Sequence, residues 1–372
     1  MDPQTVFCHN PVCPASGQVG KGNIGVHSVK ERRYICHVCG KTFAETKGTV
    51  FYRLRTAKDI VVLVVTLLAY GCPLQAICIA FGLDERTVLD WQTRAGQHCQ
   101  RVHEHLIEQP RDLGQVQADE IRVKIQGRIL WMAMAIQVQT RLWLGGALST
   151  ARDMNLMVTL MQKVRHSTLC RPLLFCVDGC AAYIGAIRRV FREPIRTGKP
   201  GRPPLRPWDG IYIAQVVKQY AHKQVVAVSR HIVQGSQAQI DALLQITQGG
   251  GSINTAFIER LNATFRSCIT ALIRRGRALI RHTTTLHNAM YLTSTVYNFC
   301  IYHKSLRVPF YLSNQRRRWL RRTPAIAAGV TDHLWTVQEL LSFRVPLPPW
   351  QPPRRRGRPS NALKSLVAQW CS

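Results

Sequence analysis

Residues 114–149 decide the fold class that this sequence predicts. They open with GQVQADEIRVK (114–124), continue with ILWMAMAIQVQ (129–139) and close with a third apolar run over 141–149. The first run alternates polar and apolar residues, which is typical of a β-strand with one buried face. Only short turn segments separate the runs, so we expect three consecutive strands joined by hairpins.

The segments that follow predict a strand–helix–strand arrangement and a closing helix. PLLFCVD (172–178) has the pattern of a buried strand that ends in a carboxylate. A basic loop rich in proline and glycine, over 193–210, precedes two further strand patterns. The other expected elements are helices at 152–165 and 180–192, strands at 211–217 and 224–233, and a long amphipathic helix at 254–280. Together they predict an α/β fold with a mixed sheet flanked by helices.

The composition indicates a folded protein with a polyanionic partner. The chain has 372 residues, of which 46% are hydrophobic, a share too high for a disordered basic tail. The length allows about two or three domains and excludes a small disulfide-stapled module. Lys and Arg outnumber Asp and Glu by 50 to 20, which gives a formal net charge of +30. This charge favours nucleic acid as the partner, with an anionic membrane surface as the alternative.

The sequence predicts neither an export signal nor a membrane span. The N-terminus lacks the cationic segment followed by an apolar one that marks a secretory signal. The longest apolar run, IVVLVVTLLA at 60–69, is about half as long as a spanning helix must be. The 13 cysteines are an odd number, which fits reduced thiols in a cytoplasm. We therefore expect a cytoplasmic protein with no membrane partner, in which clustered cysteines are candidate metal ligands.

Four cysteines near the N-terminus have the spacing of a metal site. Cys8 and Cys13 form one short pair, Cys36 and Cys39 form another, and 22 residues separate the pairs. Four thiolates in this arrangement suit one tetrahedral Zn²⁺ ion with a structural role. Gly40, after the second pair, permits the tight turn that such a site requires. The alternatives are buried free thiols and, with less support from the context, a C-x-x-C redox pair.

Residues 74–96 fit a helix-turn-helix. The pattern predicts a helix at 74–80, a turn at 81–84 that contains Gly82, and a second helix at 85–96 with Asp84 as its N-cap. In a DNA complex, the residues near a major groove would be Arg86, Thr87 and Arg94. The alternative is a plain pair of packed helices, because such patterns have many false positives.

Acidic residues are scarce, and three of them occupy positions where a solvated charge is unexpected. Asp119 lies within the first strand pattern, and Asp178 closes an apolar run. Glu259 lies on the expected long helix, beside its apolar stripe. Two strand-borne aspartates and a helix-borne glutamate can converge on two divalent cations, Mg²⁺ or Mn²⁺, for attack at a phosphodiester. The alternative is that these acids belong to ordinary ion pairs.

Neighbouring residues complete this candidate site. Asn262 and Arg266 follow Glu259 by three and seven positions, so they lie on the same face of the helix. Arg266 could therefore contact a phosphate. Glu120 should point to the other face of its strand, which makes it a weak candidate.

The C-terminal part of the chain is rich in Arg and Pro. Residues 356–359 read RGRP, which resembles the core of an AT-hook. In an extended Arg-Gly-Arg segment, Arg356 and Arg358 would fit a narrow A·T minor groove. The alternative is a solvated basic tail that binds the DNA backbone without sequence preference.

Several of these segments resemble one known family. YICHVCGKTFAETKGTVFYRLRT (34–56) and GCPLQAICIAFGLDERTVLDW (71–91) resemble the zinc ribbon and helix-turn-helix of the DDE transposases of bacterial insertion sequences, of the insertion-sequence-one type. The segments that carry that family's three acids match GQVQADEIRVK, LLFCVDG (173–179) and NTAFIERLNATFR (254–266), at Asp119, Asp178 and Glu259. Asn262 and Arg266 match the end of the last motif, and TPAIAAGVTDHLWTVQELL (323–341) resembles a segment found downstream.

The resemblance implies both an organisation and an activity. The expected domains are a zinc ribbon (1–50), a helix-turn-helix DNA-binding domain (51–110), an RNase H-like DDE catalytic domain (111–305) and a basic C-terminal tail with the AT-hook-like motif (306–372). The family implies two Mg²⁺ ions in the catalytic site, strand cleavage by water and strand transfer by a 3′-hydroxyl. The implied partner is double-stranded DNA, at the element ends and at the target.

The implied reaction leads to further expectations about oligomeric state and localisation, and two alternative functions remain. Two element ends must be joined at one target, so we expect a homo-oligomer on DNA, associated with a bacterial nucleoid. One rival is a transposase-derived DNA-binding regulator without catalysis. A second is a host nuclease with the same metal chemistry and no joining activity.

Overall fold

The chain folds into two compact units. The computed structural model describes residues 1–169, 171–195, 198, 201–222, 224–273, 280–311, 316–352 and 359–371. One unit contains Met1–Val62 together with Gln338–Ser372, and the other contains Leu63–Val337. No helix in these described ranges combines the length and the apolar character that a membrane-spanning segment needs.

The smaller unit is built around a three-stranded antiparallel sheet. Its strands are β1 (Ile24–Ser28), β2 (Arg33–Cys36) and β3 (Thr42–Ala44), in the order β1-β2-β3, after the 3₁₀ helix η1 (Pro3–Thr5). The core holds buried cysteines next to Tyr34 and Phe43. Trp370, at the end of helix α11 (Asn361–Trp370), is buried in the same core. The N-terminal sheet and the C-terminal helix therefore share one apolar core.

Three helices lead into the larger unit. They are α1 (Lys58–Ala69), α2 (Leu74–Phe81) and α3 (Glu85–Leu106). Gly82 follows α2 in the left-handed conformation, with φ of 61°, and the Asp84 carboxylate accepts a hydrogen bond from the Arg86 backbone N–H at 2.8 Å. The predicted turn and N-cap are confirmed. The predicted end at residue 96 is wrong, because α3 continues for ten more residues.

Gly96 lies where two helices cross at close range, and it does not end a helix. A Cβ atom at Gly96 would lie 2.5 Å from the Cβ of Asn288 and 2.6 Å from its Cα, far inside normal contact distance. Asn288 belongs to α8 (Thr283–Phe299), a helix that is buried along most of its length. The missing side chain of Gly96 therefore lets α3 and α8 approach backbone to backbone.

A six-stranded mixed sheet forms the centre of the larger unit. Its strands are β4 (Gln115–Ile125), β5 (Arg128–Gln137), β6 (Trp143–Ser149), β7 (Leu173–Asp178), β10 (Ile211–Ala221) and β11 (Gln224–Gln234), in the order β11-β10-β7-β4-β5-β6. The strands β4, β5 and β6 are antiparallel hairpin neighbours, whereas β7 is parallel to both β4 and β10. The three consecutive strands and the mixed sheet flanked by helices are confirmed.

Helices cover both faces of this sheet. On one face lie α6 (Gln237–Gln248) and α7 (Ala256–Cys268), which hydrogen-bond to Gln115 and Gln117 of β4. On the other lie α5 (Ala181–Val190) and its neighbour α4 (Met154–His166), and Tyr183 of α5 reaches Glu120. The expected helix over 254–280 is wrong beyond Cys268. Ile269 is extended, and the short 3₁₀ helix η2 (Thr270–Leu272) follows, so that the apolar Ile269 and Leu272 stay buried without one continuous helix.

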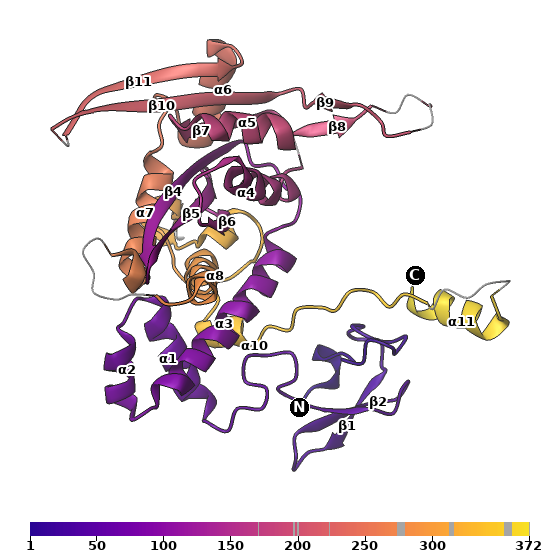
Figure 1. Ribbon diagram of the computed structural model, residues 1–372. Coiled ribbons are helices and arrows are strands. Elements are labelled where there is room, and N and C mark those ends of the chain that lie inside the picture. Colours follow the sequence, from indigo (N-terminus) through magenta and orange to yellow (C-terminus); the bar gives the residue numbers. More distant parts are fainter. Residues whose placement is uncertain are drawn as a thin grey trace. The chain divides into compact units, whose positions relative to one another are not determined.

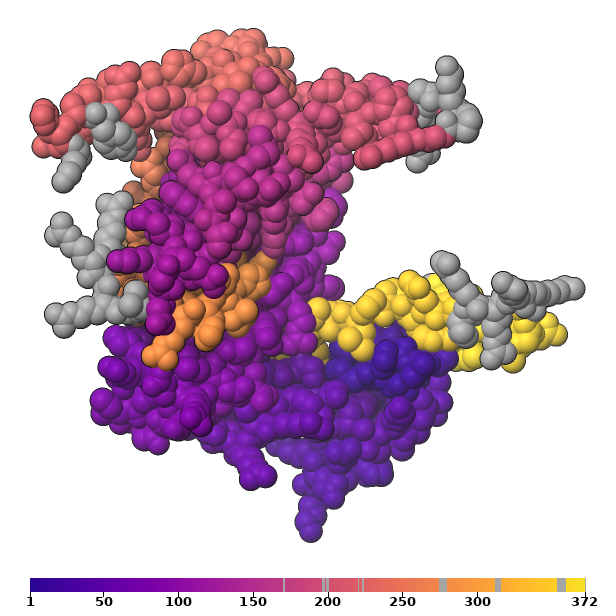
Figure 2. Space-filling view, in the orientation of Figure 1, coloured from indigo at the N-terminus to yellow at the C-terminus, as the bar shows by residue number. Residues whose placement is uncertain are grey.

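The remaining elements are short, except for one long ribbon. The strands β8 (Arg192–Pro194) and β9 (Leu205–Pro207) pair within the segment expected as a loop. The other short elements are η3 (Lys304–Leu306), β12 (Val308–Tyr311), β13 (Arg317–Leu320), α9 (Pro324–Ala327) and α10 (Val337–Ser342). Within the described residues, the far ends of β10 and β11 pair with each other and with no third strand, and they project from the sheet as a ribbon (Figures 1 and 2).

Replacing Gly96 with Ala tests the helix crossing. Helix propensity alone favours Ala over Gly by about 1 kcal/mol. Forcing extra atoms into a packed core typically costs about 1–3 kcal/mol, and here the new atom would meet backbone of Asn288. We therefore expect Gly96→Ala to lower the free energy of unfolding by about 1–2 kcal/mol, measured by denaturant unfolding.

The exposed neighbour Gln97 supplies the control for this experiment. Gln97→Ala should change the stability by less than about 0.5 kcal/mol. A gain in stability from Gly96→Ala would show that α3 and α8 are farther apart than described.

Candidate active site

A cavity lies where the central strand β7 stops short of its neighbours. β7 ends at Asp178, whereas β4 continues to Ile125 and β10 continues to Ala221. The last aligned pair of β4 and β7 joins Ala118 to Val177. The carboxyl end of a strand between two longer parallel neighbours is a common place for a ligand site in α/β proteins. The cavity at this end has a volume of about 560 Å³.

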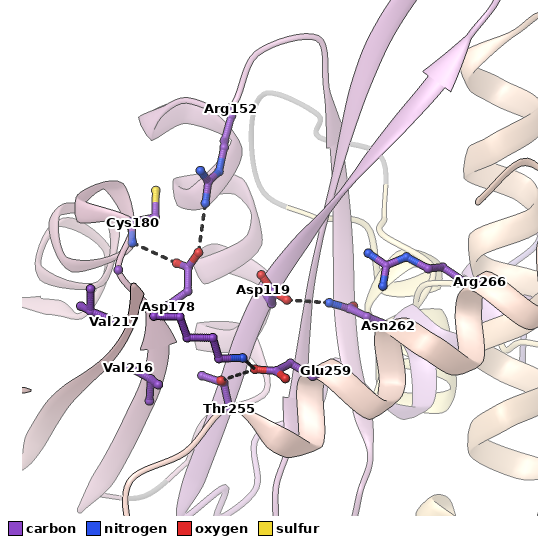
Figure 3. Close-up of a pocket in the computed structure, with 12 residues that line it drawn as sticks. Asp119, Arg152, Asp178, Cys180, Val216, Val217, Thr255, Glu259, Asn262 and Arg266 are labelled. Carbon is purple, nitrogen blue, oxygen red and sulfur yellow. Dashed lines mark hydrogen bonds and ion pairs between the residues drawn. The ribbon is translucent and has the colours of Figure 1, made fainter. Parts of the chain in front are cut away.

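The three predicted acids enter this cavity from three different elements. Asp119 and Asp178 come next after the aligned Ala118 and Val177, so they point to the same face of the sheet. Glu259 lies in the first turn of α7, which crosses that face. Figure 3 shows the three carboxylates pointing into one space. The cavity is also lined by the cations Arg152, Lys218 and Arg266 and by Asn262.

Asp119 is the most perturbed of these acids. Burial and the charge of Glu120 raise the pKa of its carboxyl group to about 7. The amide Nδ2 of Asn262 donates a hydrogen bond to Asp119 Oδ2 at 2.7 Å. Asn262 is only 2% exposed, and its Oδ1 atom has no hydrogen-bond partner among the described residues. A buried acceptor without a donor beside a crowded carboxylate indicates a site that a cation or its hydration shell would complete.

Asp178 is connected to a fourth acid, Glu120. Arg152 donates to Asp178 Oδ2 at 3.0 Å and also forms an ion pair with Glu120. The hydroxyl of Tyr183 donates to Glu120 at 2.8 Å, and burial raises the pKa of Glu120. Oxygen atoms of Asp119, Glu120 and Asp178 lie within 4.8 Å of one another, so these three residues could hold a metal ion.

Glu120 lies closer to the other acids than its place in the strand pattern predicts. The side chain does point away from the face of Asp119, as alternation predicts, because it meets Tyr183 on the opposite helix layer. However, β4 has already passed the end of β7 at this position. β5 still pairs with β4 at Glu120, but on the other side of β4 the pairing with β7 has ended, so a long carboxylate side chain can reach Asp178. The adjacent Asp119 and Glu120 were the only hint in the sequence that both acids belong to the site. The sequence did not show where β7 ends, and this end decides whether Glu120 can reach Asp178.

Glu259 is held apart from the other carboxylates. Its Oε1 atom accepts hydrogen bonds from Lys218 Nζ at 2.5 Å and from Thr255 Oγ1 at 2.6 Å. Burial acts to raise the pKa of Glu259, but these two hydrogen bonds outweigh it and leave the pKa below the ordinary value. Glu259 lines the cavity, yet it does not belong to the group of three acids within 4.8 Å. Lys218 and Arg152 were not predicted from the sequence as residues of this site.

Gln117 places α7 relative to β4. Its Oε1 atom accepts hydrogen bonds from the backbone N–H groups of Phe257 and Ile258, both at 3.0 Å. Its Nε2 atom donates to the carbonyl of Asn254 at 2.8 Å. The side chain thus satisfies backbone donors at the start of α7 that have no partner inside the helix. Gln117 was also missed, because a glutamine within a strand pattern carries no signal of this role.

The four N-terminal cysteines come together in the smaller unit. Their sulfur atoms all lie within 4.8 Å of one another, so the cluster could hold a metal ion. Cys8 and Cys39 are 3.7 Å apart, and Cys13 and Cys36 are 3.9 Å apart. Gly40 has φ of 67°, and its N–H donates to the carbonyl of Cys36 at 2.8 Å. The predicted turn after the second cysteine pair is confirmed.

The candidate DNA-contacting residues lie in different surroundings. Arg86 is exposed on the first turn of α3, whereas Thr87 and Arg94 are partly buried. Arg94 pairs with Asp90 at 2.6 Å. Arg266 lines the cavity, and Asn262 is buried against Asp119. Arg356 and Arg358 lie outside the described residues.

The raised pKa of Asp119 predicts how pH affects a variant without this carboxylate. The folded protein holds a proton on Asp119 up to about pH 7, while the unfolded chain loses it near the ordinary value. The stability of the metal-free protein should therefore fall as pH rises from about 4 to 7. Asp119→Asn removes this effect. It should stabilise the protein by about 1–2 kcal/mol more at pH 8 than at pH 5, measured by urea unfolding without added divalent metal.

Asp241→Asn, at an exposed position of α6, is the matched control and should show no such pH dependence. Equal effects of Asp119→Asn at both pH values would contradict the description of Asp119 as a crowded, buried acid.

Comparisons with known proteins do not assign the chain to a family. No family model matches the sequence, and no curated protein matches it. The functional conclusion therefore depends on the residues and the geometry described above.

Proposed function

We propose that this protein is a DDE transposase, which binds the ends of its insertion sequence, cleaves DNA strands there and transfers them into target DNA. The observation that carries the proposal is the meeting of Asp119, Asp178 and Glu259 in one cavity at the carboxyl end of β7. The resemblance of the three motifs to that family supports it. So does the order of elements, since three hairpin strands, a strand–helix–strand unit and a closing helix fit an RNase H-like domain.

The donor set of the cavity fits Mg²⁺ or Mn²⁺. Its carboxylates are the hard oxygen donors that these cations prefer, and Asn262 Oδ1 is a further acceptor that has no partner in the part of the chain that the structure describes. Two divalent cations held by Asp119, Asp178 and Glu259 would activate the attacking oxygen and stabilise the leaving oxygen. In the proposed reaction, Asn262 orients the Asp119 carboxylate, and Arg266 contacts a phosphate of the bound strand.

The four-cysteine cluster fits a structural Zn²⁺ ion. Tetrahedral zinc with Zn–S bonds of about 2.3 Å requires sulfur atoms about 3.8 Å apart. The distances of 3.7 Å and 3.9 Å between the cysteine pairs agree with this value. We propose that zinc stabilises the smaller unit, with no open coordination position for catalysis.

DNA binding in this proposal uses the charge of the chain and the α2–α3 pair. The net charge of +30 suits the phosphate backbone, whose contacts make affinity strongly dependent on salt. The turn at Gly82 and the N-cap at Asp84 support a helix-turn-helix in which α3 presents Arg86 to a groove. Joining two element ends would require more than one copy of the chain on DNA.

Strand cleavage tests the proposed activity. The substrate is a labelled fragment that carries the DNA flanking the gene, incubated with Mg²⁺ or Mn²⁺. We expect cuts at defined positions with the wild-type protein. Asp178→Asn and Glu259→Gln should each reduce cleavage by more than about 100-fold, beyond the loss typical of a residue that only supports a metal ligand.

Asp241→Asn is the control, because it makes the same charge change on an exposed helix and should cleave like the wild type. Sequence-specific binding without cuts would favour the regulator. Cuts without joined products would favour the host nuclease.

Zinc content tests the cysteine site. We expect about one zinc per chain in the purified protein, and less than about a fifth of that in Cys36→Ser, because loss of one ligand opens the tetrahedral site. The measurement is elemental analysis of the full chain. Cys371→Ser, at an exposed cysteine outside the cluster, should keep its zinc. Full zinc content in Cys36→Ser would be incompatible with the assignment.

A further inference from the structure

Glu259 and Lys218 form an ion pair inside the cavity, with Lys218 Nζ 2.5 Å from Glu259 Oε1. Lys218 lies on β10, two residues beyond the last residue that pairs with β7. Its Nζ atom reaches across the cavity to Glu259 Oε1 on α7. Asp119 is held by an uncharged amide, and Asp178 shares its Arg152 with Glu120. Glu259 therefore differs from Asp178 in that its cation, Lys218 on β10, is not the arginine shared with Glu120.

The ion pair between Lys218 and Glu259 can break while β10 and α7 stay folded. The Lys218 side chain is 31% exposed and that of Glu259 is 43% exposed, so water reaches both. Ion pairs with this exposure contribute little net stability, because solvent screens them and their long side chains keep alternative positions. Thr255 would continue to hold Glu259 Oε1 when Lys218 leaves. The lysine is thus an exchangeable partner, whereas Thr255 is a local one, the N-cap residue of the helix that carries Glu259.

The charge balance of the cavity favours such an exchange. The cavity is lined by three acids and three cations, so their formal charges cancel. The acids are Asp119, Asp178 and Glu259, and the cations are Arg152, Lys218 and Arg266. Two divalent cations would add four positive charges and would repel the ammonium group from the carboxylates. A phosphodiester oxygen, with its negative charge, would then be the favourable partner for Lys218 in the same cavity.

We propose that Lys218 is a mobile counter-ion that couples metal binding to nucleic-acid binding. Without metal, Lys218 holds the Glu259 carboxylate and keeps it from binding the second of the two proposed metal ions. When metal takes Glu259, Lys218 moves to a phosphate of the bound strand. Metal and phosphodiester therefore bind with positive cooperativity, each favouring the other by the same factor. This inference rests on the proposed function, which assigns the cavity to two divalent cations and a DNA strand.

A double-mutant cycle of metal binding tests the pair directly. Binding of Mn²⁺ to the full chain is followed by the loss of the electron paramagnetic resonance signal of free Mn²⁺. Lys218→Met should tighten the weaker class of Mn²⁺ binding about tenfold, because the competing ammonium group is gone. In the Glu259→Gln background, the same change should tighten binding less than about twofold, because no carboxylate is left to release.

The cycle separates a specific pair from a general loss of positive charge. An equal gain from Lys218→Met in both backgrounds would reduce Lys218 to one charge among several and overturn the proposal. No gain in either background would also overturn it. Lys124→Met supplies the matched control, since Lys124 is exposed near the far end of β4 and does not line the cavity. It should leave Mn²⁺ binding unchanged.

The coupling to DNA is measured in the same assay with a short DNA oligonucleotide as the probe. In the wild type, saturating oligonucleotide should tighten the weaker Mn²⁺ class about fivefold or more, within the range of ordinary coupling between two sites. In Lys218→Met, most of this gain should disappear, because metal no longer has to displace a lysine. A gain of the same size in both proteins would contradict the transfer of Lys218 to phosphate.

These measurements can fail independently of the proposed transposase activity. Coupling without strand cleavage would keep the role of Lys218 and remove the catalytic assignment. Cleavage that depends on Asp178 and Glu259, but with no coupling in the cycle, would keep the catalytic assignment and remove the role of Lys218.

Discussion

The buried side chain of Gln117 joins strand β4 to the start of helix α7, and the geometry of the candidate active site depends on this connection. One amide group satisfies two backbone donors and one backbone acceptor of another element. Asp119 is two residues farther along the same face of β4, and Glu259 is within the first turn of the anchored helix. The position of Glu259 relative to Asp119 is therefore set by a short chain of buried hydrogen bonds, and the Asn262–Asp119 contact extends that chain one helical turn farther. Buried polar groups of this kind specify one arrangement because every alternative leaves them unpaired.

The second constraint on the site is electrostatic. Four carboxylates gather in and beside one cavity of a strongly basic chain, and burial with like charge raises the pKa of Asp119 and Glu120. Arg152 and Lys218 relieve part of this repulsion, one between Asp178 and Glu120 and the other at Glu259. The same crowding that disfavours the empty carboxylates would favour a divalent cation. The proposed metal chemistry and the proposed role of Lys218 thus have a common physical origin.

Particular residues show how far the sequence could predict this arrangement. The alternation in 114–124 and the apolar run ending at Asp178 correctly placed two strands and two acids, because strand periodicity is a local property. The sequence pattern predicts the end of a helix at Gly96, whereas in the structure Gly96 packs against Asn288, in a helix nearly 200 residues away in sequence. The helix expected to run to residue 280 ends at Cys268 although its apolar spacing continues. Four residues of the site were not predicted from the sequence: Glu120, Lys218, Arg152 and Gln117. Their partners are distant in sequence, and the register in which strands pair leaves no local signal.

The sequence by itself determined the order of the strands along the chain, the turn and N-cap around Gly82 and Asp84, the two cysteine pairs and the three scarce acids. All of these follow from side-chain chemistry within a few residues. The tertiary structure alone decided that β7 ends between two longer parallel strands, and this end creates the cavity. It also decided that Lys218 meets Glu259 across that cavity, and that Asn262 turns its amide to Asp119. These contacts depend on strand register and on where α7 docks, which only the packing of the whole unit determines, because buried apolar area and polar pairing are satisfied together in one arrangement.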